Sequence, residues 1–226
     1  RGIASALMQE ALREIRRLGG RWVGLEVQAD NQAALRLYEC LGFRSVGRAL
    51  HMLRPAGLPW AKDAPSHPAL RRARSDESVE LIRLVRAVVP KHQRLLMELR
   101  EKDYRPGWRS IIDRWLEGRS DIWWVVEERG AICGAVRASR RRGRRPNRLE
   151  VLTAPEHSGR FDSLLVRRGM ASMRGAFKKP VEKMVEIVLP KPTQSLIAAL
   201  EAESFRELRW LVHMRLDMHG VQTEWQ

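Results

Sequence analysis

Three side chains that can handle protons or polar groups lie near the start of the chain: Glu26, Asn31 and Tyr38. A tyrosine hydroxyl has a pKa near 10 and can protonate a leaving group, and a carboxylate can take a proton from an amine. Tyr38 follows Asn31 by about two helical turns, so the two side chains point roughly the same way. Their types and spacing therefore allow acid–base chemistry.

Each of the three residues also has a purely structural interpretation. Asn31 can cap a helix by accepting a backbone hydrogen bond. Tyr38 can be half-buried, with its ring packed and its hydroxyl hydrogen-bonded. Glu26 stands between Leu25 and Val27, so it can be the solvent-facing residue of an alternating strand. The residues alone leave both interpretations open.

The segment Gly2-Ile3-Ala4-Ser5-Ala6 opens a predicted helix. Small side chains before a helix let backbone N–H groups approach a phosphate, and the positive end of the helix dipole favours its charge. Taken alone, this pattern favours ordinary close packing at a helix start.

The elements around these residues follow from hydrophobic periodicity and from Gly and Pro. The first part of the chain is predicted to contain a helix over 4–18, a strand over 22–27, a helix over 31–41 and a strand or strand pair over 43–53. A helix between strands this close is typical of a mixed or parallel sheet with helical crossovers.

A segment rich in Pro and Gly, 55–69, is predicted to be a linker. A second unit follows it, with helices, a strand meander and then helix, strand, helix, strand. Helices are predicted over 79–89, 92–99, 108–116, 162–173 and 195–202, and strands over 122–127, 131–138, 149–153, 184–189 and 208–216.

The run from Leu25 to Phe43 follows the pattern L-E-V-x-x-x-N-x-x-A-x-x-L-Y-x-x-x-G-F. It resembles the C-terminal half of the GCN5-related N-acetyltransferases, the GNAT superfamily. Arg1-Gly2-Ile3-Ala4 resembles the end of that family's pyrophosphate signature, (Q/R)-x-x-G-x-(G/A), with Gly2 and Ala4 at the small positions. The first position of the signature would precede residue 1, so we expect the chain to start inside a domain.

The resemblance implies a cofactor, a reaction and roles for the residues. It implies acetyl-CoA as the cofactor, bound by Gly2, Ile3, Ala4, Ser5, Ala6 and Asn31. It implies that Tyr38 is the general acid toward coenzyme A. Glu26 matches a glutamate that takes the proton of the amine in ribosomal-protein N-terminal acetyltransferases. The expected reaction is direct transfer of the acetyl group to a primary amine, and the acceptor, a peptide N-terminus or a small molecule, stays open.

The end of the second unit can be laid over the end of the first without a gap, so that Gly42-Phe43 falls on Ser204-Phe205. The chemistry is not repeated, because Val188, Thr193 and Leu200 stand where the first unit has Glu26, Asn31 and Tyr38. The loop 157–162 has one Gly and no second small residue at the required spacing.

We therefore expect an α/β fold with a mixed sheet of the GNAT type, in two parts. Residues 1–54 are predicted to be the C-terminal half of a GNAT domain and 55–69 a linker. Residues 70–218 are predicted to form a complete but catalytically silent GNAT-like domain, and 219–226 a tail.

The net charge is +15, with 42 Lys and Arg against 27 Asp and Glu. Such a charge can draw a protein to nucleic acid or acidic surfaces, although Arg on ordinary solvated faces is the favoured interpretation. A non-catalytic module that binds an acidic partner or RNA is thus the alternative to an enzyme, with Arg140 to Arg148 as its densest basic cluster.

The six His show no metal-ligand spacing, so no metal is predicted. Two cysteines fit a reducing compartment, and a cytoplasmic location is expected. No apolar stretch reaches the length of a membrane helix, so no membrane partner is expected. The oligomeric state is left open.

Overall fold

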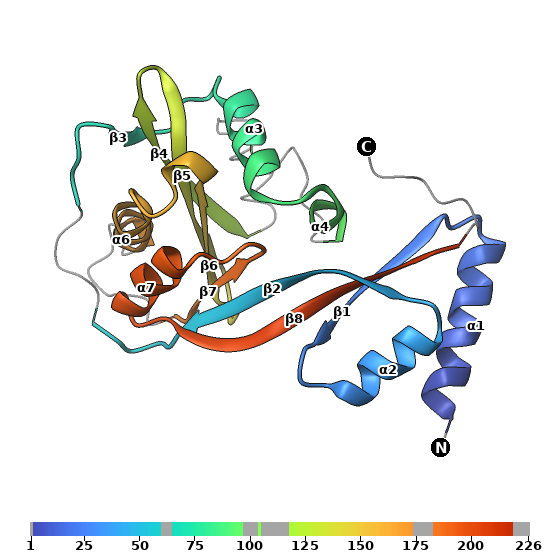
Figure 1. Ribbon diagram of the computed structural model, residues 1–226. Helices are drawn as coiled ribbons and strands as arrows, with labels where there is room; N and C mark the ends of the chain where they lie inside the picture. Colours follow the sequence, from blue (N-terminus) through green and yellow to red (C-terminus); the bar gives the residue numbers. More distant parts are fainter. Residues whose placement is uncertain (1, 60–64, 97–103, 105–117, 174–182, 219–226) are drawn as a thin grey trace. The chain divides into compact units, whose positions relative to one another are not determined.

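The computed structural model describes residues 2–59, 65–96, 104, 118–173 and 183–218 (Figure 1). The chain forms two compact units. Unit 1 contains Arg1–Ala49 and Arg209–Gln226, and unit 2 contains Leu50–Leu208. The end of the chain therefore belongs to the same compact unit as its beginning.

Unit 1 is built from two helices and parts of three strands. Its elements are α1 (Ile3–Arg17), β1 (Trp22–Gln28), α2 (Gln32–Cys40), the first part of β2 (Arg44–Arg54) and the last part of β8 (Arg206–Asp217). The strands β1 and β8 pair antiparallel, from Trp22 opposite Asp217 to Gln28 opposite Leu211. The buried core of the unit consists of Leu12, Val27, Phe43, Val212, Met214 and Met218.

Both helices of unit 1 pack on one face of its strands. Met8 and Ile15 of α1, and Leu35 and Tyr38 of α2, lie against the same core cluster. Val23, Leu25 and Val27 of β1 also contact this cluster. Because side chains alternate along a strand, the residues between them face the opposite side of the sheet.

Unit 2 follows the predicted meander and crossovers. Its elements are the last part of β2, then β3 (Leu70–Arg72), α3 (Ser78–Val88), α4 (Lys91–Leu96), β4 (Arg119–Glu128), β5 (Ala131–Arg141), β6 (Asn147–Thr153), the 3₁₀ turn η2 (Pro155–His157), α6 (Asp162–Met173), β7 (Val185–Leu189), α7 (Gln194–Ala202) and the start of β8. The strand β7 pairs parallel with β6 and antiparallel with β2. The strand order by hydrogen bonding is β1-β8-β2-β7-β6-β5-β4-β3, which confirms the mixed sheet.

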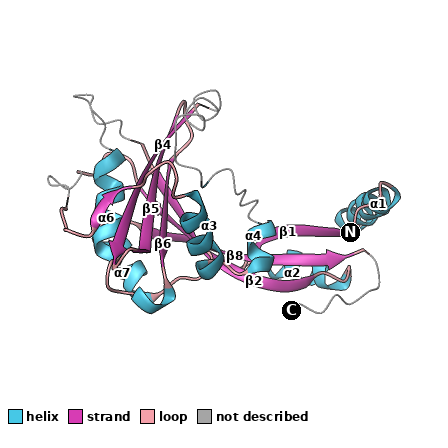
Figure 2. Cartoon of the chain, turned by 90° about the horizontal axis from the view of Figure 1, so that it is seen from above, coloured by secondary structure: helices cyan, strands magenta, loops and turns pink. Residues whose placement is uncertain are grey.

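Helices cover both faces of the sheet in unit 2, with α6 and α7 on one side and α3 on the other (Figure 2). The helix α6 approaches the sheet closely at Gly169. A Cβ added there would lie 2.5 Å from Leu149 and 2.6 Å from Val136. On the other face, α3 contributes Leu81, Leu84 and Val85 to a cluster that contains Trp123, Val125, Ala135 and other buried residues.

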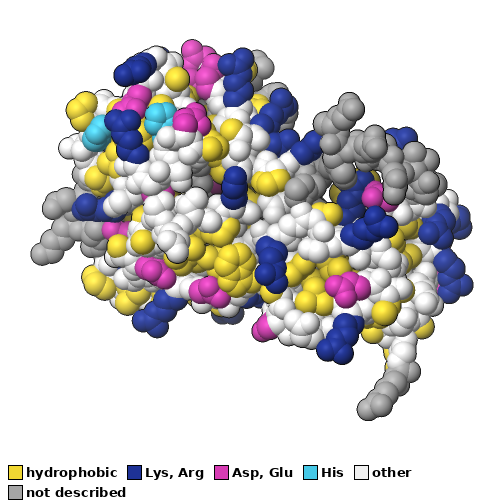
Figure 3. Space-filling view, in the orientation of Figure 1, with side chains coloured by type: hydrophobic (Ala, Val, Ile, Leu, Met, Phe, Trp, Pro, Cys, Tyr) yellow, Lys and Arg dark blue, Asp and Glu magenta, His cyan; other side chains and the backbone are white. Residues whose placement is uncertain are grey.

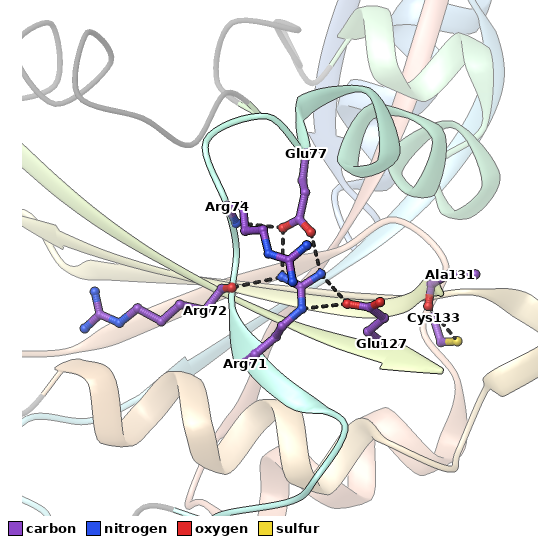
Figure 4. Close-up of polar contacts among 7 residues, drawn as sticks. All are labelled: Arg71, Arg72, Arg74, Glu77, Glu127, Ala131 and Cys133. Carbon is purple, nitrogen blue, oxygen red and sulfur yellow. Dashed lines mark hydrogen bonds and ion pairs between the residues drawn. The ribbon is translucent and has the colours of Figure 1, made fainter. Parts of the chain in front are cut away.

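The short strand β3 is held by a polar network around Arg71 (Figure 4). The Arg71 guanidinium donates to both carboxylate oxygens of Glu77, just before α3, and to Glu127 of β4 at 2.6 Å. These contacts raise the pKa of Arg71, and the contact with Arg71 lowers the pKa of Glu77, which is only 8% exposed. Leu70 is the one apolar residue of this three-residue strand, which is too short to show an alternating pattern, so sequence reasoning missed it.

The two helices α2 and α7 end and begin in the same way. Phe43 N–H donates to Tyr38 and Gly42 N–H to Glu39, and at the second site Phe205 N–H donates to Leu200 and Ser204 N–H to Glu201. This is the Schellman arrangement, in which the residue after the helix takes a left-handed conformation. Gly42 and Ser204 do so, with φ of 90° and 67°.

The N-terminal caps of α2 and α7 match as well. The side chain of Asn31 accepts from Ala34 N–H at 3.1 Å, and that of Thr193 accepts from Leu196 N–H at 3.3 Å. Asn31 and Thr193 are related by the same displacement along the chain as Phe43 and Phe205. The gapless overlay of the two units therefore agrees with the backbone geometry at both ends of this helix.

Most predicted elements agree with the observed ones within a few residues, and the predicted bounds of α6 match. The predicted helix over 108–116 and the end of the one over 92–99 lie outside the described residues. The compact units do not follow chain order, because β2 and β8 are each divided between them. Among the described residues, no helix is both long and apolar enough to cross a membrane.

Because Gly42 and Ser204 share a left-handed conformation, replacing each by the other's residue type should change the stability in opposite directions. Ser204→Gly should stabilise the protein by about 1 kcal/mol, because an L-residue is strained at positive φ and glycine is not. Gly42→Ser should destabilise it by at least as much, since its Cβ would also lie 3.3 Å from Leu216. Urea unfolding of both variants and of the double exchange is the measurement, and a destabilised Ser204→Gly variant would contradict the assignment.

Candidate active site

The candidate acid, Tyr38, lies on the helix face that packs against the core of unit 1. Its ring meets Phe43 edge-on, with the centroids 5.8 Å apart. The side chain is half-buried. Within the part of the chain that the structure describes, no hydrogen-bond partner of its hydroxyl is found. Ring packing therefore fixes Tyr38 while the hydroxyl remains able to donate a proton.

The candidate base, Glu26, lies on the opposite face of β1 from Tyr38, because Leu25 and Val27 face the core. Its cross-strand neighbour in the register is His213 of β8. The Glu26 Oε1 atom lies 3.2 Å from Nε2 of His213, which is fully buried, whereas the glutamate side chain is 44% exposed. Neither ring nitrogen of His213 makes a hydrogen bond among the described residues, so the contact with Glu26 is a close approach of the two polar groups. The solvent-facing carboxylate of Glu26 thus lies against the buried imidazole of His213.

The candidate phosphate-binding segment opens α1. Gly2 stands before the helix with φ of 108°, and its carbonyl oxygen accepts from Ala6 N–H at 2.9 Å. The amides of Ile3, Ala4 and Ser5 have no acceptor within the helix, as in any first turn. No acidic residue stands in this turn, and a Cβ added to Gly2 would meet no atom within 4 Å. The helix start is therefore open and electropositive.

The corresponding segment of unit 2 is occupied by a side chain of its own. Asp162, at the first position of α6, is 2% exposed. Its carboxylate accepts from Gly159 N–H at 3.2 Å, from Ser195 Oγ at 2.7 Å and from Thr153 Oγ1 at 2.8 Å. A buried anion thus already takes the backbone amide that a phosphate would need.

The other positions of unit 2 that correspond to the candidate residues are also changed. Leu200, at the position of Tyr38, is fully buried and apolar. His51 occupies the position of His213 and pairs with Val188, so no carboxylate faces it directly. Its imidazole instead lies 3.7 Å from Glu186, which also binds Arg141 at 3.0 Å. These contacts, with that of His51 the largest, lower the pKa of Glu186.

The structure therefore brings the sequence-predicted residues into one unit but not onto one face. Asn31 is the cap of α2, Tyr38 lies on the core side of β1, and Glu26 lies on the other side. Sequence reasoning missed His213 and Asp162. The overlay places His213 on His51, and this repeated histidine is the signal that could have drawn attention to it.

Residues 1–43 match the family model described as Acetyltransferase (GNAT) family. Over this stretch, the chain is similar to the GNAT acetyltransferases. A 42-residue stretch is 52% identical to the mycothiol acetyltransferase of Nocardiopsis dassonvillei, covering 19% of this chain. The match spans only 13% of the length of that relative.

Two solved structures show the same fold over nearly the whole chain. A tandem GNAT protein from the clavulanic acid biosynthesis pathway matches with a TM-score of 0.64 and 17% identity, over 98% of this chain and 72% of its own. A GNAT from Sphaerobacter thermophilus matches with a TM-score of 0.61 and 16% identity, over 97% of this chain and 69% of its own. These likenesses confirm the predicted GNAT fold.

The buried carboxylate of Asp162 predicts a large loss of stability when it is removed. Asp162→Ala leaves three donors without an acceptor and should cost about 3 kcal/mol. Asp162→Asn keeps one acceptor oxygen and should cost less. The free energy of unfolding from urea titration is the measurement, with Asp76→Ala, at an exposed site, as the control expected within about 0.5 kcal/mol. Equal losses at the two aspartates would contradict the role given to Asp162.

Proposed function

We propose that unit 1 transfers the acetyl group of acetyl-CoA to a primary amine, and that unit 2 is catalytically silent. The match of residues 1–43 to the GNAT family model supports acetyl transfer as the reaction class. The observation that carries the proposal is the placement of Tyr38 and Glu26 on opposite faces of β1, with the latter backed by His213.

This placement suits the two proton transfers of the reaction. The amine must lose a proton when its nitrogen bonds to the acetyl carbon, and the sulfur must gain one when the carbon–sulfur bond breaks. The two protons are exchanged at different atoms, nitrogen and sulfur, so the base and the acid need not contact each other. Glu26 takes the proton of the amine, and Tyr38 gives its proton to the thiolate.

His213 acts in this proposal as a positioning residue. Its ring is fully buried, so it is fixed by packing, and Oε1 of Glu26 lies 3.2 Å from its Nε2. A carboxylate held by a fixed neighbour samples fewer rotamers than a free one on the same strand. The strand β8 thus supplies, from the end of the chain, a residue that orients the base of the first unit.

The start of α1 and the cap of α2 are proposed to hold the cofactor. The amides of Gly2, Ile3, Ala4 and Ser5 are proposed to donate to the pyrophosphate at the positive end of a helix. Ala6 lines the same turn, and its N–H donates to the carbonyl oxygen of Gly2. Asn31 uses its Oδ1 atom as a cap and keeps its amide NH₂ group for the pantetheine arm. The contrast with Asp162 supports unit 1, rather than unit 2, as the proposed cofactor-binding unit.

In chain order, we propose residues 1–54 as the catalytic half-domain and 55–69 as a linker. Residues 70–218 then form the silent domain, which completes unit 1 through β8. The basic side chains that favour a nucleic-acid partner are spread over the face drawn in Figure 3, with acidic and hydrophobic side chains between them.

The acceptor is proposed to be a primary amine on a small molecule, with peptide N-termini as the other class. The relative that bears the name mycothiol acetyltransferase favours small molecules as the first acceptors to test. A panel that contains amino sugars, amino acids and short peptides separates the two classes.

The roles of Tyr38 and Glu26 predict losses in turnover without losses in folding. In the protein expressed from its own gene, Tyr38→Phe and Glu26→Gln should each lower kcat by about 10²- to 10⁴-fold, the usual size of an acid or base effect. Release of the coenzyme A thiol in the presence of the amine panel is the measurement. Glu39→Gln, on the exposed side of α2, is the matched control and should keep full activity. Unchanged turnover in Tyr38→Phe would refute its role as the acid.

A further inference from the structure

A second group of chemically active side chains lies in unit 2, and none of them takes part in the proposed acetyl transfer. Glu128 ends β4, Cys133 lies near the start of β5, and His157 ends η2. One ligand atom of each lies within 4.8 Å of the ligand atoms of the other two. The three residues come from three segments of the chain, which explains why their spacing in the sequence shows no metal motif.

Backbone pairing brings these segments together. The strands β4 and β5 form a hairpin in which Glu128 pairs with Ala131. The next strand, β6, pairs with β5, and Ala154 N–H then donates to the carbonyl oxygen of Cys133 at 2.9 Å. His157 N–H donates to Ala154 at 2.8 Å, which places the η2 turn over the hairpin end. The position of the three side chains is thus set by the sheet.

The same residues line a cavity of about 630 Å³, together with Arg129, Ala131 and Arg160. The Cys133 residue is 4% exposed, and its thiol donates to the Ala131 carbonyl only at 3.5 Å, a contact drawn in Figure 4. A weakly bonded thiol, an imidazole and a carboxylate therefore surround one side of an open space.

The carboxylate is held in place by a neighbour. Arg160 donates to both oxygens of Glu128, at 2.6 and 2.8 Å. A carboxylate has about four acceptor positions, two on each oxygen. The paired hydrogen bonds from Arg160 therefore leave one acceptor position open on the Oε2 atom of Glu128. That atom lies 3.9 Å from Nδ1 of His157. Ligating carboxylates are commonly oriented by such an outer hydrogen bond.

We propose that Glu128, Cys133 and His157 form a site for a thiophilic divalent cation of the zinc type, with the fourth position open to the cavity. Sulfur, nitrogen and oxygen donors in one site suit zinc, and three protein ligands with an open position are typical of non-structural sites. Deprotonation of the thiol on binding gives two anionic ligands, which balance the charge of the ion. The site is independent of the acetyl transfer proposed for unit 1.

The donor atoms must close by about 1 Å to bind one ion, because the donors of an occupied tetrahedral zinc site lie about 3.3–3.7 Å apart. The buried cysteine is fixed, whereas the side chains of Glu128 and His157 are about one-quarter exposed and can move toward it.

Cobalt provides the test, because a thiolate bound to Co²⁺ gives a charge-transfer band in the near ultraviolet. The titration uses the full chain with Cys40→Ser, which leaves Cys133 as its one thiol. We expect a band that saturates at one Co²⁺ per chain and disappears when Zn²⁺ is added. No band in this background would overturn the proposal.

Variants of the three residues separate the site from adventitious binding. Adding Cys133→Ser should remove the band, and Glu128→Gln or His157→Gln should weaken Co²⁺ binding at least tenfold. Glu156→Gln, an exposed neighbour of His157, is the matched control and should bind as the parent does. A band that survives Cys133→Ser, or full binding by the His157→Gln variant, would also overturn the site.

Discussion

The pairing of β1 with β8 is the interaction on which the candidate active site depends. It places a strand from the end of the chain beside the strand that carries Glu26, and it sets the register in which His213 faces that glutamate. The same strand contributes Val212 and Met214 to the core under Tyr38. The apolar face of β8 therefore packs under the proposed acid and its polar face lies beside the proposed base, since neighbouring residues of a strand point to opposite sides. Loss of this pairing would remove both supports together.

The two units share a backbone design and differ in the atoms that fill it. Matching caps at both ends of α2 and α7 keep the strand–helix–strand geometry, which needs only an acceptor at the N-terminus and a left-handed residue after the C-terminus. Thr193 and Ser204 meet those needs without the chemistry of Asn31 or the freedom of Gly42. At the phosphate loop, the buried carboxylate of Asp162 supplies internally the negative charge that an open loop would take from a ligand. Such a unit can lose catalysis and remain folded.

Local signals in the sequence were sufficient for features set by local physics. Periodicity predicted α6 with its observed bounds, and the Asn-to-Phe motif located the cap, the helix and its exit, because each of these depends on residues a few positions apart. Features set by distant residues were not accessible in this way. The contact between Glu26 and His213, the three donors to Asp162 and the division of β2 and β8 between units all join segments far apart in the chain. The strand β3 was missed for a related reason, since a charge network and not an apolar pattern holds it.

The central claim is that Glu26 removes the proton of the amine and that His213 acts only by orienting Glu26. A double-mutant cycle on kcat/KM, with Glu26→Gln, His213→Gln and both together, tests it most directly, in protein checked for folding by its unfolding transition. If the histidine acts by orienting the glutamate, the double variant should lose no more activity than Glu26→Gln alone. If the two losses multiply, His213 acts independently of the base and the account of the site is wrong.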